Sequence, residues 1–330
     1  MCIRDSINWD SKVLHSIRPV IENLENVSID HVQLNTEAKK LSTVNYEIKV
    51  ANNQDKRPED IIRKTMLINT LNFAFTDFES QIKYALNVGD NTFSDTDAMV
   101  YQIDQAVEVG IDFYDGHYLR DITETTFKSI FRANIEMPMS KEKTDVLNQV
   151  GQILVEEYKG DWLNFVKSGP KKLYQNGEGL IERLVSQFER FRDTSIYLGE
   201  EVHFLKLAQL AFWGIHRELG KYGDFYIEDM ENMTAFADYI VPVALEKMKI
   251  ITYSEKLKNK IEQGVLIESD SIEEIEIRAA TLFVTAQLTE EINKLRLDDE
   301  KIIIPQLDFK LWTDFHANKS PHHLTKTIMY

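Results

Sequence analysis

The chain has 330 residues and a formal net charge of −16 at pH 7, because 54 Asp and Glu outnumber 38 Lys and Arg. Hydrophobic residues make up 43% of it, which is ordinary for a folded, water-soluble protein. Its one cysteine, Cys2, excludes an intrachain disulfide and favours a reducing compartment. No apolar run approaches a membrane span, and the acidic charge disfavours binding to nucleic acid phosphates. We therefore expect a soluble, cytoplasmic protein that binds neither a membrane nor a nucleic acid, and we expect a monomer.

The first predicted elements are two short strands near the N-terminus. Residues 27–34 and 44–50 alternate polar and apolar side chains and are rich in β-branched residues, so they predict a small hairpin. The polar stretch 51–58 that follows is the best candidate boundary in the chain. It predicts an N-terminal arm of mixed structure, residues 1–55, before a helical catalytic body, residues 56–330.

Helical periodicity dominates the body. Apolar residues recur there at steps of three and four positions, which is the spacing of an amphipathic helix. The chain contains only 13 Gly and 7 Pro, too few for an all-β sandwich. The sequence therefore predicts a mainly α protein that forms one compact domain overall. The expected helices are residues 97–110, 140–158, 178–188, 200–220, 254–263, 271–293 and 305–314.

Lys206 lies within the predicted helix 200–220, where polar residues recur at three- and four-residue steps. Such a stripe is typical of the solvent-exposed face of a helix. Because Leu205 and Leu207 flank the lysine, the alternative is that its ammonium group points into a pocket as a fixed positive charge. Both interpretations stay open here. The polar residues that share this face are His203, Lys206, Gln209, His216 and Arg217.

Asp238 is the only charged residue between Glu231 and Glu246, and its neighbours are apolar. A lone buried carboxylate costs several kcal/mol unless it is paired, so this residue is hydrogen-bonded, exposed or functional. One interpretation is a cap for a helix over residues 241–249, with Pro242 in the first turn. The other is a catalytic carboxylate. The pattern alone does not separate the two.

Two further charged stretches have modest interpretations. Glu274 and Arg278 are spaced for an exposed i,i+4 ion pair, which contributes about 0.2–0.5 kcal/mol. His322 and His323 are adjacent near the C-terminus, and adjacent histidines rarely bind one metal ion. We therefore expect no metal site and no cofactor. A metal-dependent hydrolase that uses these histidines with nearby carboxylates is the alternative.

Six short blocks occur in order along the chain: NTLNFAF (69–75), FRDTSIYLG (191–199), FLKLAQL (204–210), FADYIVP (236–242), EIEIRAAT (274–281) and PHHLTKTIMY (321–330). Together they resemble the queuosine salvage protein family, the queuosine 5′-phosphate N-glycosylases. The resemblance implies a mainly helical fold similar to that of helix-hairpin-helix DNA glycosylases. It also implies hydrolysis of queuosine 5′-monophosphate, a small-molecule substrate, with release of the 7-deazaguanine base queuine for return to tRNA.

The resemblance implies that Lys206 and Asp238 are the catalytic residues, because they match the Lys and Asp of the family's KRAQ and FADY blocks. Asp238 would stabilise the positive charge that develops on the ribose and activate the attacking water. Lys206 would keep Asp238 ionised and position the ribose or the water. The other blocks supply the residues expected to bind the nucleotide: Asn72, Phe73, Phe75, Asp193, Phe236, Tyr239, Arg278, His323 and Lys326. The aromatic residues among them would flank the base, and the last two would meet the phosphate.

Four positions depart from the usual pattern of the family. Leu207, Ile240, Leu324 and Lys326 stand where the family usually has arginine. Lys326 keeps the positive charge but lacks the bidentate geometry of a guanidinium. These departures favour one alternative to turnover, which is a family member that binds a nucleotide or deazapurine without cleaving it.

Overall fold

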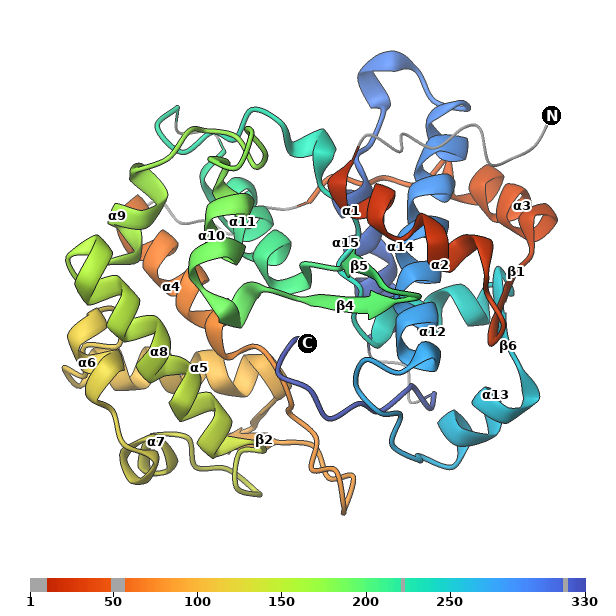
Figure 1. Ribbon diagram of the computed structural model, residues 1–330. Helices are drawn as coiled ribbons and strands as arrows, with labels where there is room; N and C mark the ends of the chain where they lie inside the picture. Colours follow the sequence, from red (N-terminus) through yellow and green to blue (C-terminus); the bar gives the residue numbers. More distant parts are fainter. Residues whose placement is uncertain (1–10, 49–56, 221–222, 317–319) are drawn as a thin grey trace. The chain divides into compact units, whose positions relative to one another are not determined.

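The computed structural model describes residues 11–48, 57–220, 223–316 and 320–330, and it is mainly helical, as the sequence predicts (Figure 1). The chain forms two compact units. The first unit comprises residues 1–50, 193–209 and 229–326, and the second comprises residues 51–192, 210–228 and 327–330. The division into an arm and a body stays a prediction, because residues 49–56 at the predicted boundary lie outside the described residues.

The first unit is built around α14 (Ile272–Asn293), which packs against α2 (Arg18–Glu22), α3 (His31–Leu41), α12 (Ile240–Lys247) and α15 (Ile304–Phe315) (Figure 1). Every α14 residue from Glu274 to Thr289 is buried, because neighbours cover this helix on all sides. The remaining elements of the unit are α1 (Lys12–Ser16), β1 (Val27–Ile29), β4 (Thr194–Tyr197), β5 (Glu200–His203), η3 (Met230–Asn232), β6 (Ile251–Tyr253), α13 (Glu255–Glu262) and η4 (Asp298–Glu300).

Glu276, fully buried in α14, anchors the loop that leads into β1. Its carboxylate accepts hydrogen bonds from the backbone N–H groups of Glu25, Asn26 and Val27, at 2.6–3.2 Å. Backbone N–H groups need acceptors, and one buried carboxyl side chain accepts from three of them here. The carboxylate therefore fixes the point at which the N-terminal segment meets the core of the unit.

The predicted N-terminal hairpin is wrong. β1 covers only Val27–Ile29, and it pairs antiparallel with β6, with Val27 opposite Tyr253. Asp30 then begins α3, because its carboxylate accepts from the N–H groups of Val32 and Gln33, both at 2.9 Å. The second strand of the predicted hairpin, residues 44–50, does not form over residues 44–48. Residues 49–50 lie outside the described part of the chain.

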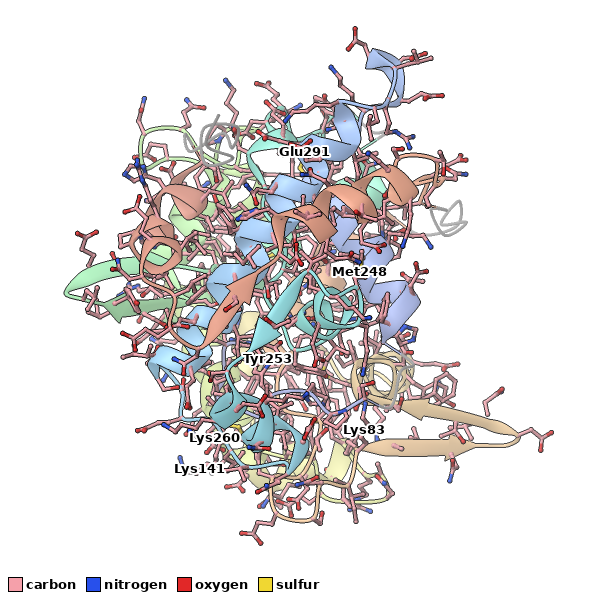
Figure 2. The ribbon with its side chains drawn as sticks, turned by 90° about the vertical axis from the view of Figure 1, so that its right-hand side faces the viewer. Lys83, Lys141, Met248, Tyr253, Lys260 and Glu291 are labelled. Atoms are coloured by element: carbon pink, nitrogen blue, oxygen red, sulfur yellow. The ribbon has the colours of Figure 1, made fainter. Side chains whose placement is uncertain are left out.

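α3 is fixed to the rest of the first unit by a contact that its strand-like pattern hides. Gln33 donates a hydrogen bond to the carbonyl of Met248, the residue after α12, at 2.8 Å. Figure 2 labels Met248 and also Tyr253, the last residue of β6. Helix formation at residues 31–41 therefore depends on a cap and on long-range packing, which outweigh the β-branched composition.

The second unit is built around α8 (Ser140–Tyr158), which packs against α4 (Pro58–Leu71), α6 (Gly116–Asp121), α7 (Glu124–Ile130) and α9 (Trp162–Lys167). At Gly151 a Cβ atom would lie 2.3 Å from the backbone nitrogen of Arg120, so the close approach of α6 requires glycine. The other elements are β2 (Ala85–Val88), β3 (Asn91–Ser94), α5 (Asp95–Glu108), α10 (Leu180–Gln187) and η2 (Glu189–Phe191). α11 (Lys206–Leu219) begins in the first unit and continues in the second.

Most of the predicted helices are confirmed, because α5, α8, α10, α13, α14 and α15 fall at the expected places. The prediction for residues 200–220 is wrong at its start, since residues 200–203 form β5 and pair with β4. Leu198 and Gly199 between these strands have φ of 51° and 87°, the geometry of a two-residue hairpin turn. The sequence analysis predicted strands only at residues 27–34 and 44–50, so this hairpin is a correction to it. Across the described residues, no helix has the length and apolar character that a membrane span requires.

We predict that Glu276→Gln lowers the free energy of unfolding by about 2 kcal/mol, because the amide places an NH₂ group against backbone donors and removes the charge they bind. Urea denaturation measures the change. Glu231, an exposed glutamate in the same unit, provides the control. Glu231→Gln should leave the unfolding curve unchanged, and equal curves for both variants would contradict the anchoring role of Glu276.

Candidate active site

Asp238 lies in the first unit, two residues before the start of α12 at Ile240, and is 8% exposed. Its Oδ1 accepts hydrogen bonds from the N–H groups of Ile240 at 2.8 Å and Val241 at 3.2 Å. Asp238 therefore binds the first two N–H groups of α12 as the capping interpretation expected, but it does so from the position before the N-cap residue, Tyr239. Within the described part of the chain, Oδ2 accepts no hydrogen bond, so the same carboxylate has one anchored oxygen and one available oxygen. The N-terminus of α12 stabilises the negative charge.

Lys206 begins α11 and is 6% exposed, so the solvent-stripe interpretation is wrong for this residue. Gln209, one turn later, is also buried and hydrogen-bonds to Thr234. Burial lowers the pKa of the Lys206 ammonium group, and the nearby carboxyl groups of Asp238 and Asp308 oppose that shift. Lys206 therefore lies in a buried site with two carboxyl groups as its main electrostatic neighbours.

Asp308 is the residue of this cluster that the sequence analysis missed. It lies on α15, is 3% exposed, and its Oδ2 accepts a hydrogen bond from the Phe236 N–H at 2.9 Å. Burial and the negative charge of Asp238 raise the pKa of Asp308 well above its usual value, against the opposing effects of the Phe236 N–H and Lys206. A signal was present in the sequence, because Asp308 falls between Leu307 and Leu311 on the apolar face of its helix.

Arg278 and Asp193 form a buried bidentate ion pair. The two terminal nitrogens of the guanidinium lie 2.8 and 2.6 Å from the two carboxylate oxygens, and each residue is 2% exposed. Arg278 Nε also donates to the carbonyl of Ala237 at 3.2 Å, and Nη1 donates to Glu274 at 3.4 Å. The predicted ion pair between Glu274 and Arg278 forms, but the prediction that it is exposed is wrong, because both residues are buried in α14.

This pair connects the segments that hold both candidate catalytic residues. Asp193 accepts the backbone N–H of Lys206 at 3.0 Å, at the start of α11. Arg278 holds the carbonyl of Ala237, the residue before Asp238. Leu205, just before the lysine, has φ of 52°, a strained conformation for a branched residue. The ion pair thus positions both side chains through their backbones.

The C-terminal block of the first unit lies beside Tyr239. The ring of His322 stacks on that of Tyr239, with centroids 4.5 Å apart, and the carbonyl of Leu324 accepts the N–H of Ile267 at 2.8 Å. His323 is buried, and burial together with the charges of His322 and Arg278 lowers its pKa to about 3. It is therefore neutral at pH 7, whereas Lys326 is exposed.

Three of the predicted site residues lie in the second unit. Phe73 and Phe75 are buried there against Lys143, whose Nζ lies 3.8 and 4.7 Å from their ring centroids. The same nitrogen donates to the carbonyls of Leu71, at 3.0 Å, and Phe73. Asn72 accepts a hydrogen bond from Thr96 at 2.8 Å. Burial lowers the pKa of Lys143 well below its usual value.

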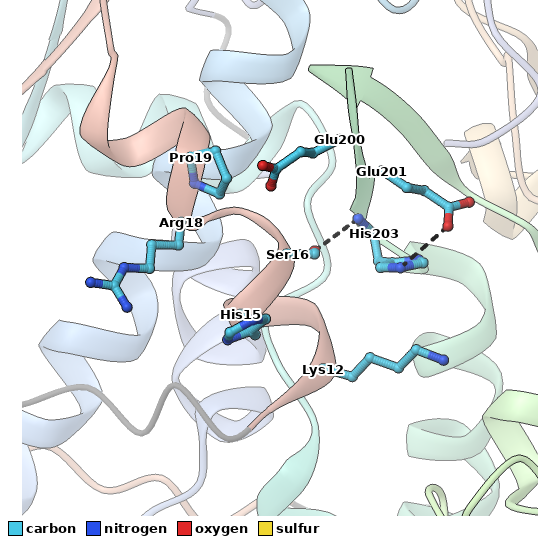
Figure 3. A pocket seen from close by; sticks show the side chains of 8 residues that line it. All are labelled: Lys12, His15, Ser16, Arg18, Pro19, Glu200, Glu201 and His203. Carbon is cyan, nitrogen blue, oxygen red and sulfur yellow. Dashed lines mark hydrogen bonds and ion pairs between the residues drawn. The ribbon is translucent and has the colours of Figure 1, made fainter. Parts of the chain in front are cut away.

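A different part of the first unit holds an open pocket of about 780 Å³, shown in Figure 3. It lies between α1–α2 and β5, and none of the predicted site residues lines it. Within the pocket, Nε2 of His203 lies 3.7 Å from Oε2 of Glu201. Its lining residues are Lys12, His15, Ser16, Arg18, Pro19, Glu200, Glu201 and His203. In the described residues, no three His, Cys, Asp or Glu side chains converge to hold a metal ion.

Comparison with known proteins identifies the family. The profile of the queuosine salvage protein family matches residues 51–330. This chain belongs to the queuosine salvage protein family. It is 27% identical to a queuosine 5′-phosphate N-glycosylase/hydrolase of Sphaerobacter thermophilus and 27% identical to the protein of that name in Mus musculus, each over 96% of this chain and 97% of the relative. The protein of that name in Dictyostelium discoideum is 29% identical, over 86% of this chain and 83% of the relative.

Three departures from the usual family pattern have different surroundings in the first unit. Leu207 is 1% exposed and Ile240 is 8% exposed, so both are core residues, whereas Leu324 is only partly buried. An apolar side chain in the core avoids the cost of burying a guanidinium. In this member of the queuosine salvage family, the ionisable residues of the cluster are therefore Lys206, Asp238, Asp308 and the Arg278–Asp193 pair.

We predict that His323 makes folding stability pH-dependent. Its pKa is about 3 in the folded protein and about 6.5 when unfolded, so the unfolded chain takes up an extra proton below pH 6.5. Stability is fully present above pH 6.5 and falls by up to about 1.4 kcal/mol per pH unit towards pH 3. His323→Gln should therefore be less pH-sensitive than the unaltered protein, by about 1 kcal/mol between pH 6 and pH 5 in urea denaturation.

The exposed histidine His316 provides the control for that measurement. His316→Gln should reproduce the pH dependence of the unaltered protein. An identical pH dependence for His323→Gln would contradict a buried, neutral His323.

Proposed function

We propose that this protein hydrolyses the N-glycosidic bond of queuosine 5′-monophosphate and releases queuine. The observation that carries the proposal is the buried Asp238 carboxylate, with one oxygen anchored on α12, the other available, and Lys206 as its neighbour. The activity named for its relatives supports the substrate. Incubation with queuosine 5′-monophosphate and chromatography for free queuine tests the proposal directly.

Asp238 supplies the electrostatic stabilisation in this proposal. Cleavage of an N-glycosidic bond builds positive charge on the ribose, in an oxocarbenium-like transition state. A carboxylate fixed beside C1′ before the reaction stabilises that charge without reorganising, and little water surrounds it to screen its field. Its available Oδ2 also accepts a proton from the attacking water. Because Oδ1 is held by two N–H groups, the carboxylate keeps its orientation throughout.

Lys206 positions rather than reacts. A positive charge beside a developing cation would raise the barrier, so its contribution is to hold Asp238 ionised and to orient the ribose or the water. The Arg278–Asp193 pair does not react either. It holds the backbone at Lys206 and at Ala237, the residue before Asp238, and so fixes the positions of Lys206 and Asp238. We propose that Asp193 and Arg278 position the catalytic residues and do not contact the substrate directly, because their side chains form an ion pair with each other.

The remaining predicted residues keep their proposed roles in substrate binding. Phe236 and Tyr239 flank the base, and Tyr239 is held by its stack on His322. A role in substrate binding for Asn72, Phe73 and Phe75, which lie in the second unit, stays a prediction. His323 acts on the phosphate as a neutral N–H donor, and Lys326 supplies the positive charge.

The finer fold and the setting of the enzyme are also proposals. We propose that the helical body shares the fold of helix-hairpin-helix DNA glycosylases, which the family resemblance supports. The net charge of −16 favours a free nucleotide over a nucleic acid as the substrate. A cytoplasmic monomer is consistent with the single cysteine.

We predict that Asp238→Asn lowers kcat by at least about 10²-fold with little change in thermal stability. The amide oxygen still caps α12, but it neither stabilises a cation nor accepts a proton. Asp30→Asn is the matched control, because Asp30 caps α3 through the same two-donor geometry and lies on an exposed turn. Unchanged turnover in Asp238→Asn would reduce this residue to a cap, and tight substrate binding without release in the unaltered protein would support the non-catalytic alternative.

We predict that Lys326→Ala raises KM for the monophosphate at least tenfold and leaves the unphosphorylated nucleoside unaffected. One charge-assisted contact to a phosphate contributes about 1.5–3 kcal/mol, which corresponds to this factor. Steady-state kinetics with both substrates measures it. Lys39→Ala removes an exposed lysine on α3 and should change neither KM. Equal losses on both substrates would remove Lys326 from the phosphate site.

A further inference from the structure

Asp308 is a buried carboxyl group beside the proposed catalytic residues, and the mechanism above gives it no task. One of its oxygens is fixed by the Phe236 N–H, in the same FADY block that carries Asp238. Its charged neighbours are Asp238 and Lys206. Burying a carboxyl group with only one of its oxygens hydrogen-bonded costs folding free energy. An apolar residue would pack α15 against its neighbours at a lower cost, so structure alone does not explain Asp308.

The proposed reaction has a matching requirement. When the bond between C1′ and the base breaks, its electron pair remains on the base, and a proton must neutralise it for the base to leave at neutral pH. A 7-deazaguanine has carbon at the position of the purine N7, so this ring offers no basic nitrogen there. The proton must reach another heteroatom of the base, and a positioned acid is the efficient source.

We propose that Asp308 is the general acid that protonates the departing base while Asp238 stabilises the ribosyl cation. This assignment rests on the proposed function. Two carboxyl groups in one site then have opposite tasks, because their surroundings differ. Asp238 accepts hydrogen bonds from two N–H donors at the start of α12, whereas Asp308 has one N–H donor, from Phe236.

The protonation state agrees with that geometry. Burial and the charge of Asp238 raise the pKa of Asp308 well above its usual value, so the group retains its proton where most carboxyl groups have lost it. Lys206 opposes this effect, and burial in turn lowers the pKa of Lys206. The cluster therefore holds a proton that it can donate next to a carboxylate that can accept one.

The step balances as follows in atoms and charge. The bond between C1′ and the base nitrogen breaks, the base takes the electron pair, and the Asp308 proton moves to the base. Water adds its oxygen to C1′, and the proton released by the water moves to Asp238. The products are queuine and ribose 5-phosphate. Asp238 returns its proton to solvent, and Asp308 takes one up, which restores the starting state.

Asp308→Asn tests the assignment, because an amide oxygen still accepts the Phe236 N–H but the side chain no longer provides an acidic proton. We expect kcat for queuosine 5′-monophosphate to fall at least about 10²-fold, with an unchanged melting temperature. The loss of kcat/KM at high pH, where a required acid is deprotonated, should disappear from the pH profile of the variant. Asp308→Glu keeps the acid and should recover part of the rate together with this alkaline limb.

Asp314→Asn is the matched control, since Asp314 is an exposed residue of the same helix, and it should behave as the unaltered protein. Turnover within threefold of normal in Asp308→Asn would overturn the assignment. A reduced rate with the alkaline limb still in place would also overturn it, because Asp308 would then only hold Phe236. If the unaltered protein releases no queuine, the proposed function itself fails, and the role of Asp308 fails with it.

Discussion

A guanidinium group as deeply buried as that of Arg278 remains in a protein interior only when acceptors meet its charge and its N–H groups. Asp193 accepts from both terminal nitrogens, the Ala237 carbonyl accepts from Nε, and Glu274 lies at the next turn of the same helix. The face of the guanidinium lies over the ring of Phe204, 4.0 Å from its centroid. Asp193 and Phe204 belong to residues 193–209, Ala237 lies just before α12, and Arg278 itself lies in α14, so one side chain fixes the relative positions of these three segments.

The chemistry of the cluster depends on that arrangement. Asp193 is used twice, since it accepts from Arg278 and from the backbone of Lys206. A buried ion pair contributes little net stability compared with apolar packing, but its geometry is far more specific. The bidentate fork allows one orientation of Asp193, and Asp193 in turn fixes where α11 begins. Loss of either partner would leave an uncompensated charge in the interior, so the two residues can change only together.

Local periodicity predicted the helices, and it did so because a helix is specified by residues three and four positions apart. Residues 140–158 were found with both ends in place for this reason. The partner of β1 was not found, because β6 lies far along the chain and nothing local to residues 27–34 encodes it. The burial of Lys206 was not predicted for a similar reason. The spacing of polar residues shows which of them share a helix face, but it does not show which distant segments cover that face. Asp308 differs, because an acidic residue on an apolar helix face is a signal that the sequence does contain.

The two units are each assembled from segments that are distant in sequence, and this affects how the chain reaches its fold. α2, α3 and β1 are synthesised early, but they pack on α14 and pair with β6, which are synthesised much later. In the second unit, Arg190 donates to the carbonyl of Ile328, two residues before the end of the chain. The first unit therefore lacks its central helix until residues 272–293 have been synthesised, and the second unit lacks the Arg190 contact until Ile328 has been synthesised. The N-terminal helices and the unpaired β1 edge remain exposed for that time, which is the condition under which nascent chains associate with one another and need chaperones.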